Sequence, residues 1–95
     1  MYNKMCLEKI YNMLKQFEHF DWVPFPHLLP FTGLTARRAY PKLFLVCVYD
    51  EDYTIESGLV LISGDAIVDL LNNFGTETGK RNALLFEEAA EMLLL

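Results

Sequence analysis

The first part of the chain carries apolar side chains at helical spacing. Intervals of four, three, four and three residues separate Cys6, Ile10, Met13, Phe17 and Phe20. This spacing places the side chains on one stripe of an α-helix, with most of the intervening polar residues on the other side. Because Pro24 disfavours a helical conformation at the residue before it, the pattern predicts a helix over Tyr2–Phe20 that ends shortly before that proline.

An apolar segment with three prolines follows, at residues 22–33. Prolines at this density disfavour a regular helix and favour extended chain. Ordinary loops are polar, whereas the aromatic side chains of this segment are Trp22, Phe25 and Phe31. The segment therefore either packs over the core or forms a docking surface, and its three aromatic residues are candidate partner-binding residues.

The middle of the chain has the pattern of buried β-strands. Leu43–Tyr49 is aliphatic, β-branched and aromatic without polar alternation, which predicts a strand covered on both faces. A polar turn at residues 50–52 leads to a second strand over Tyr53–Ile62, in which Gly58 marks a bulge. The short connection favours an antiparallel hairpin, and Thr35–Tyr40 is expected to add a weaker edge strand.

Two helices are predicted after the hairpin. The first spans Gly64–Phe74 and is followed by Gly75, which suits the position after a helix end. Thr76–Arg81 is expected to be a loop, and the last helix spans Ala83–Leu95. A short strand at Leu84–Phe86 is the alternative for part of this last segment.

This order of elements predicts an α+β fold. An N-terminal amphipathic helix, a small antiparallel sheet and two C-terminal helices pack together, in a single domain over residues 1–95. The residues expected in the core are Ile10, Met13, Phe17, Phe44, Val46, Val48, Leu59, Leu61, Ile67, Leu70 and Leu71. Hydrophobic residues make up 53% of the chain, which is high for this size and suggests that some apolar surface faces a partner.

The charges are distributed unevenly along the chain. Residues 1–49 have a net charge of +3 and residues 50–95 a net charge of −8, which indicates an interaction surface. The acidic residues expected to contact a partner are Asp50, Glu51 and Asp52 at the tip of the predicted hairpin, and Glu87, Glu88 and Glu91 on the last helix. A net negative protein is poorly suited to nucleic acid or anionic membranes, so we expect neither as a general partner.

No pattern of catalytic or metal-binding residues is recognisable. Cys6 and Cys47 lie in apolar stretches, where free cysteine is usually an inert core residue. The acidic run at residues 50–52 lacks the glycine and glutamate spacing of an EF-hand, and residues 75–81 depart from the phosphate-binding loop pattern. We therefore expect no metal, no cofactor and no enzymatic activity.

The preferred interpretation is a small non-catalytic interaction protein, such as an inhibitor, adaptor or accessory subunit. Phages and other mobile elements often encode proteins of this kind, and the expected partner is a larger protein. The alternative is a nucleic-acid-associated regulator that uses the basic cluster of Arg37, Arg38, Tyr40 and Lys42. Two cysteines, no signal-peptide pattern and a longest apolar run of seven residues favour the cytoplasm over a membrane. The apolar surplus also favours a homodimer.

Overall fold

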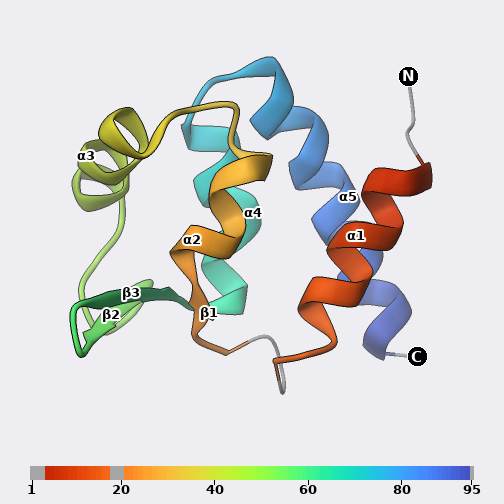
Figure 1. Cartoon of the computed structure of the whole chain (residues 1–95), viewed down its shortest axis with the longest axis horizontal. Coiled ribbons are helices and arrows are strands. Elements are labelled where there is room, and N and C mark those ends of the chain that lie inside the picture. Colours follow the sequence, from red (N-terminus) through yellow and green to blue (C-terminus); the bar gives the residue numbers. More distant parts are fainter. Residues whose placement is uncertain (1–3, 18–20, 95) are drawn as a thin grey trace.

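The described part of the chain combines five α-helices with a three-stranded antiparallel sheet, which confirms the α+β class (Figure 1). A computed structural model describes residues 4–17 and 21–94. The elements are α1 (Lys4–Leu14), β1 (Val23–Pro24), α2 (Phe25–Leu28), the 3-10 helix η2 (Leu29–Phe31), α3 (Ala36–Val46), β2 (Tyr53–Glu56), β3 (Leu59–Ile62), α4 (Gly64–Asn73) and α5 (Glu77–Leu94). None of the helices in the described part of the chain combines the length and apolar character that a bilayer span requires.

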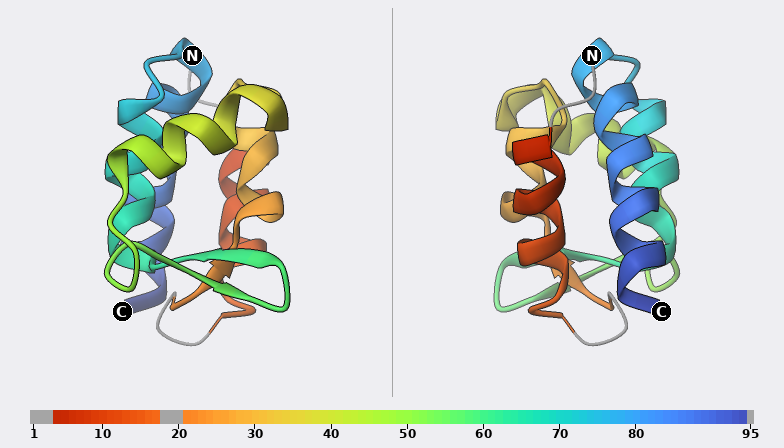
Figure 2. Two further views of the ribbon diagram at one scale, coloured as in Figure 1. Left: turned by 90° about the vertical axis from the view of Figure 1, so that its left-hand side faces the viewer. Right: turned by 90° about the vertical axis from the view of Figure 1, so that its right-hand side faces the viewer.

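Helices α1, α4 and α5 form the main helical group: α4 and α5 lie side by side, and α1 packs against α5 from the face of the molecule that also holds α2 (Figures 1 and 2). Their buried side chains meet those of α2 and β3 in one core, whose largest fully buried members are Phe25, Phe74 and Phe86. Helix α1 ends at Leu14 and a turn continues to Phe17, so the helix ends earlier than predicted. Residues 2–3 and 18–20 of the predicted helix lie outside the described part.

The sheet has the strand order β1-β3-β2. Ser57 and Gly58 connect β2 and β3, and their φ angles of 50° and 77° are those of a tight two-residue hairpin turn. The predicted second strand is therefore two strands, and Gly58 lies in the turn rather than at a bulge. The acidic run at residues 50–52 precedes β2 in a loop, so the prediction that it forms the hairpin tip is wrong.

The predicted strands at Thr35–Tyr40 and Leu43–Tyr49 are also wrong, because this region forms α3 and a following loop. Ala39 and Leu43 lie one helical turn apart and are the buried residues of α3. Thr35 has the extended conformation of an N-cap, and its carbonyl accepts a hydrogen bond of 2.8 Å from the Ala39 N–H. The sequence does not predict this helix, because the β-branched and aromatic residues after Leu43 are typical of a strand.

The change from strand to helix exposes several residues that were expected in the core. Phe44, Val46 and Val48 are exposed, and so is Leu59 on β3. Burial is confirmed for Ile10, Leu61, Ile67, Leu70 and Leu71, whereas Met13 and Phe17 are half-buried. The apolar residues of α3 after Leu43 therefore lie on the surface, whereas most of those of α4 and α5 are in the core.

The proline-rich segment packs over the core. Two of its prolines lie in the first turn of short helices, where the missing N–H leaves no hydrogen bond unmade: Pro26 is the second residue of α2 and Pro30 the second residue of η2. Val23 in β1 pairs with Ile62 of β3, and both are fully buried. Phe25 is also 0% exposed, so it belongs to the core and not to a docking surface.

Helix α5 begins six residues before the predicted start, inside the expected loop Thr76–Arg81. The Thr76 hydroxyl oxygen accepts a hydrogen bond of 2.9 Å from the Gly79 N–H, which caps the first turn. The same hydroxyl donates to the Thr32 carbonyl and so joins the start of α5 to η2. The alternative strand at Leu84–Phe86 is wrong, since α5 continues through it. Gly75 has the expected left-handed conformation after α4, with φ 75°.

Candidate functional site

The C-terminal end of α3 and the loop after it carry a run of exposed apolar side chains. We call these residues the α3 apolar surface: Phe44, Leu45, Val46, Val48 and Tyr49. Leu45 is 83% exposed, the largest fraction among the exposed apolar side chains of the described residues. The surface arises because α3 buries only Ala39 and Leu43, which leaves its apolar side chains after Leu43 exposed.

A series of aromatic contacts fixes this surface to the core. The Phe25 and Tyr40 ring centroids are 4.9 Å apart, and the Tyr40 ring lies 6.2 Å from that of Phe44. Tyr53 on β2 then contacts both Phe44, at 5.4 Å, and Tyr49, at 5.5 Å. Because such contacts add about 0.5–1.5 kcal/mol each beyond burial, α3 and β2 hold the exposed residues in a defined arrangement.

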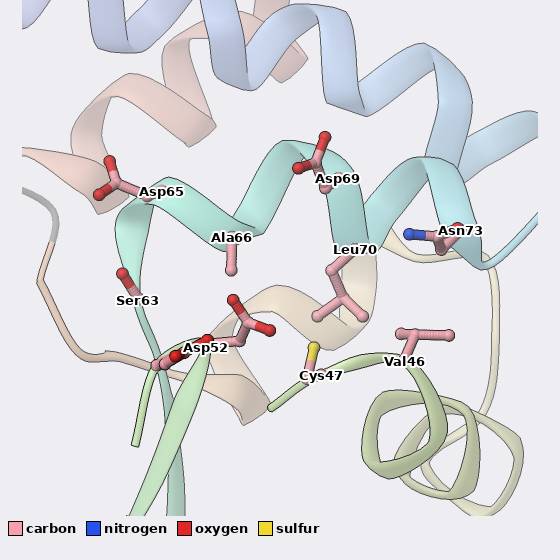
Figure 3. A pocket seen from close by; sticks show the side chains of 10 residues that line it. Val46, Cys47, Asp52, Ser63, Asp65, Ala66, Asp69, Leu70 and Asn73 are labelled. Carbon is pink, nitrogen blue, oxygen red and sulfur yellow. The ribbon is translucent and has the colours of Figure 1, made fainter. Parts of the chain in front are cut away.

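A groove of about 390 Å³ lies beside this surface, between residues 46–52 and α4 (Figure 3). Its walls carry four carboxylates, and we call it the acidic groove: Glu51 and Asp52 from the loop, and Asp65 and Asp69 from α4. Among the described residues that line it there is no lysine, arginine or histidine. Val46 contributes to both regions, so the acidic groove and the α3 apolar surface are continuous.

Asp52 holds one wall of the groove in place through three hydrogen bonds of 2.8 Å. Its Oδ2 accepts from the Val48 N–H, and its own N–H donates to the Val48 carbonyl. Its carbonyl accepts from the N–H of Ser63, the residue that precedes α4. The loop that carries Val48 is thereby linked to the start of α4.

The thiol of Cys47 lies in the acidic groove and is half-buried. Burial, and to a lesser extent the charge of Asp52, raises the pKa of this thiol from 9.0 to about 11. Near neutral pH the group is therefore a protonated thiol, which is a poor nucleophile.

The structure separates the two predicted acidic clusters. Residues 50–52 lie between α3 and β2, whereas Glu87, Glu88 and Glu91 are exposed on α5, and α4 lies between α3 and α5 (Figure 1). Asp65 and Asp69, which the sequence interpretation missed, join Glu51 and Asp52 instead. Their spacing of four residues, opposite the apolar face of α4, is the sequence signal for a shared exposed face.

No group of three or more His, Cys, Asp and Glu side chains in the described ranges is arranged to hold a metal ion. The carboxylates are distributed along the groove, as their positions in Figure 3 show for Asp52, Asp65 and Asp69.

The other candidate residues predicted from the sequence either lie apart from the groove or contact other residues of the protein. Trp22 is 38% exposed beside β1, and Phe31 is half-buried with its ring 5.6 Å from that of Phe86. Arg37 and Arg38 are exposed at the start of α3, on the basic cluster.

Two members of that basic cluster make internal contacts. The Lys42 Nζ donates a hydrogen bond of 3.3 Å to the Phe74 carbonyl at the end of α4. Tyr40 lies against the rings of Phe25 and Phe44, so its ring is not free to stack on a nucleic-acid base.

Comparisons with protein-family models, with curated proteins and with solved structures find no match to this chain.

Proposed function

We propose that this chain is a non-catalytic protein-binding protein that docks a segment of a larger protein on the α3 apolar surface and the acidic groove. The observation that carries the proposal is the run of five exposed apolar residues beside four carboxylates. Soluble monomers rarely expose large contiguous apolar patches, and those with a polar rim usually mark interaction sites.

The chemistry of the surface defines the kind of partner. Apolar side chains would cover Leu45 and Val48, and basic side chains would enter the groove beside Glu51 and Asp69. The protonated thiol of Cys47 supports a binding role for the groove over a nucleophilic one. Within this proposal the chain acts in the cytoplasm as an inhibitor, adaptor or accessory subunit.

Strand addition on β2 is a less suitable mode of binding. β2 is an edge strand, but the carbonyl of Tyr53 already accepts a hydrogen bond of 2.8 Å from the Asp50 N–H. Little of this four-residue edge is left for a further strand, so side-chain contacts with α3 are the favoured mode.

Site-specific photo-cross-linking in the cells that produce the protein tests the proposal. A photoreactive residue replaces Leu45 in one variant and Leu84, an exposed leucine on α5, in the control. We expect an adduct with a larger protein from position 45 and none from position 84. A Glu51→Lys substitution should weaken that adduct, because it reverses a charge in the groove. Equal adducts from both positions, or none from position 45, would contradict the proposal.

A further inference from the structure

The outer side of α3 carries positive charge at one end and apolar residues at the other. Arg38 and Leu45 are seven residues apart, which is two helical turns, so both lie on the stripe opposite the buried Ala39 and Leu43. Along the helix axis the two positions are separated by roughly 10 Å. Arg37 adds a second exposed positive charge at the same end.

The acidic groove continues this arrangement beyond the C-terminal end of α3. Glu51 and Asp52 follow the helix in the chain, and Asp69 of α4 lines the same groove. From Arg38 through Leu45 to Glu51, the chain therefore presents exposed side chains in the order basic, apolar and acidic. A two-fold rotation about the apolar centre superimposes the basic end on the acidic end, so the surface is complementary to itself.

We infer that, when its larger partner is absent, the protein forms a two-fold symmetric homodimer through α3. Leu45 and Val48 of the two copies meet near the axis, and Arg38 of one copy lies against Glu51 of the other. This inference rests on the proposed function, because it assigns the same surface to a second copy in the free protein. It follows that dimerisation and partner binding compete.

The test exploits the symmetry of the charge pairs. Arg38→Glu and Glu51→Lys each replace both attractive pairs of the dimer with repulsive ones, and both residues are exposed. We expect each variant alone to raise the dimer dissociation constant by roughly tenfold or more in sedimentation experiments. In an equimolar mixture, a heterodimer of the two variants has opposite charges in both pairs: the two substituted side chains face each other in one pair, and the unchanged Arg38 and Glu51 in the other. The mixture should therefore form a heterodimer with near wild-type affinity.

A Glu87→Lys variant, which changes an exposed charge on α5, is the matched control and should dimerise as the wild type does. A wild-type protein that stays monomeric at high concentration would overturn the inference. If the protein is monomeric but the photoreactive residue at position 45 cross-links to a larger protein, the proposed function stands without the dimer. If neither variant changes the affinity of the dimer, or if the mixture does not restore it, the assignment of the interface to α3 is overturned. A dimer restored by the mixture, with no larger protein cross-linked in cells, supports the inference and contradicts the proposed function.

Discussion

The helical group of α1, α4 and α5 and the region formed by α3 and β2 both contain many apolar residues, but they place these residues differently. α4 buries Ala66, Ile67, Leu70 and Leu71, whereas α3, one residue longer, buries Ala39 and Leu43. Aromatic contacts and the hydrogen bonds of Asp52 hold the second region in place. The apolar residues of the helical group therefore supply stability, whereas those of α3 after Leu43 remain exposed.

A pair of leucines gives the largest expected contrast between the two regions. Leu70 is 2% exposed and Leu45 is 83% exposed. Leu70→Ala should lower the free energy of unfolding by about 2–5 kcal/mol, because it removes buried methyl groups and leaves a cavity. Leu45→Ala should change it by less than about 0.5 kcal/mol in dilute solution. Urea denaturation measures both values, and similar losses would show that α3 is part of the core in solution.

The close approach of α5 to α4 gives a smaller but more specific contrast. A Cβ on Gly79 would lie 2.8 Å from the Leu71 carbonyl oxygen and 2.9 Å from the Thr76 Oγ1. Helix propensity alone would stabilise Gly79→Ala by about 1 kcal/mol, but overpacking typically costs about 1–3 kcal/mol. We expect a net loss of stability, whereas Lys80→Ala at the exposed neighbouring position should be almost neutral. A more stable Gly79→Ala variant would show that the two helices are less closely packed.

These contrasts also explain which parts of the fold could be predicted from the sequence. The helix over residues 64–74 was predicted almost to the residue because its apolar spacing and its terminal glycine agree. α3 was missed because β-branched and aromatic residues cluster after Leu43, and the sparse stripe of Ala39 and Leu43 is a weak signal. The sequence did not predict the start of α5, because Gly79 suggests a loop. In the structure this glycine lies inside the helix, where the close approach of α4 leaves no room for a Cβ.

The candidate site was predictable only in part for a related reason. Glu51 and Asp52 stand out as a charged run in the sequence. Asp65 and Asp69 have ordinary positions on the polar face of a helix, and their approach to that run depends on how α4 packs beside the loop. Tertiary packing, which local patterns do not specify, creates the groove.

The polar contacts of Asp52 offer a further test of what holds the α3–β2 region. Asp52→Ala removes the acceptor of the Val48 N–H and should cost about 1 kcal/mol. Asp52→Asn keeps an oxygen acceptor and should cost less. Hydrogen exchange of the Val48 amide should be faster in the alanine variant. Core amides of α5 should exchange faster only by the amount that the lower free energy of unfolding accounts for. Unchanged exchange at Val48 would mean that the aromatic contacts alone fix the loop.

The smallest expected effect concerns Cys47, which lies at the boundary between the two regions. Its thiol has a folded-state pKa of about 11, against an ordinary value of 9.0, first because of burial and second because of the charge of Asp52. As pH rises, the unfolded chain loses this proton before the folded protein does. The stabilising contribution of the protonated thiol is therefore complete below pH 9.0 and is lost as pH rises through about 11.

Alkylation of Cys47 by iodoacetamide in a Cys6→Ser background measures this pKa directly, because the thiolate is the reactive species. The native protein should show a rate midpoint near pH 11, and denaturant should move it toward 9.0. Asp52→Asn should lower the native midpoint without restoring 9.0, since burial is the larger cause of the shift and remains in the variant. A native midpoint already near 9.0 would show that water reaches the thiol freely. In that case the groove wall would be as exposed as the α3 apolar surface beside it, and the boundary between the two regions would lie deeper in the protein.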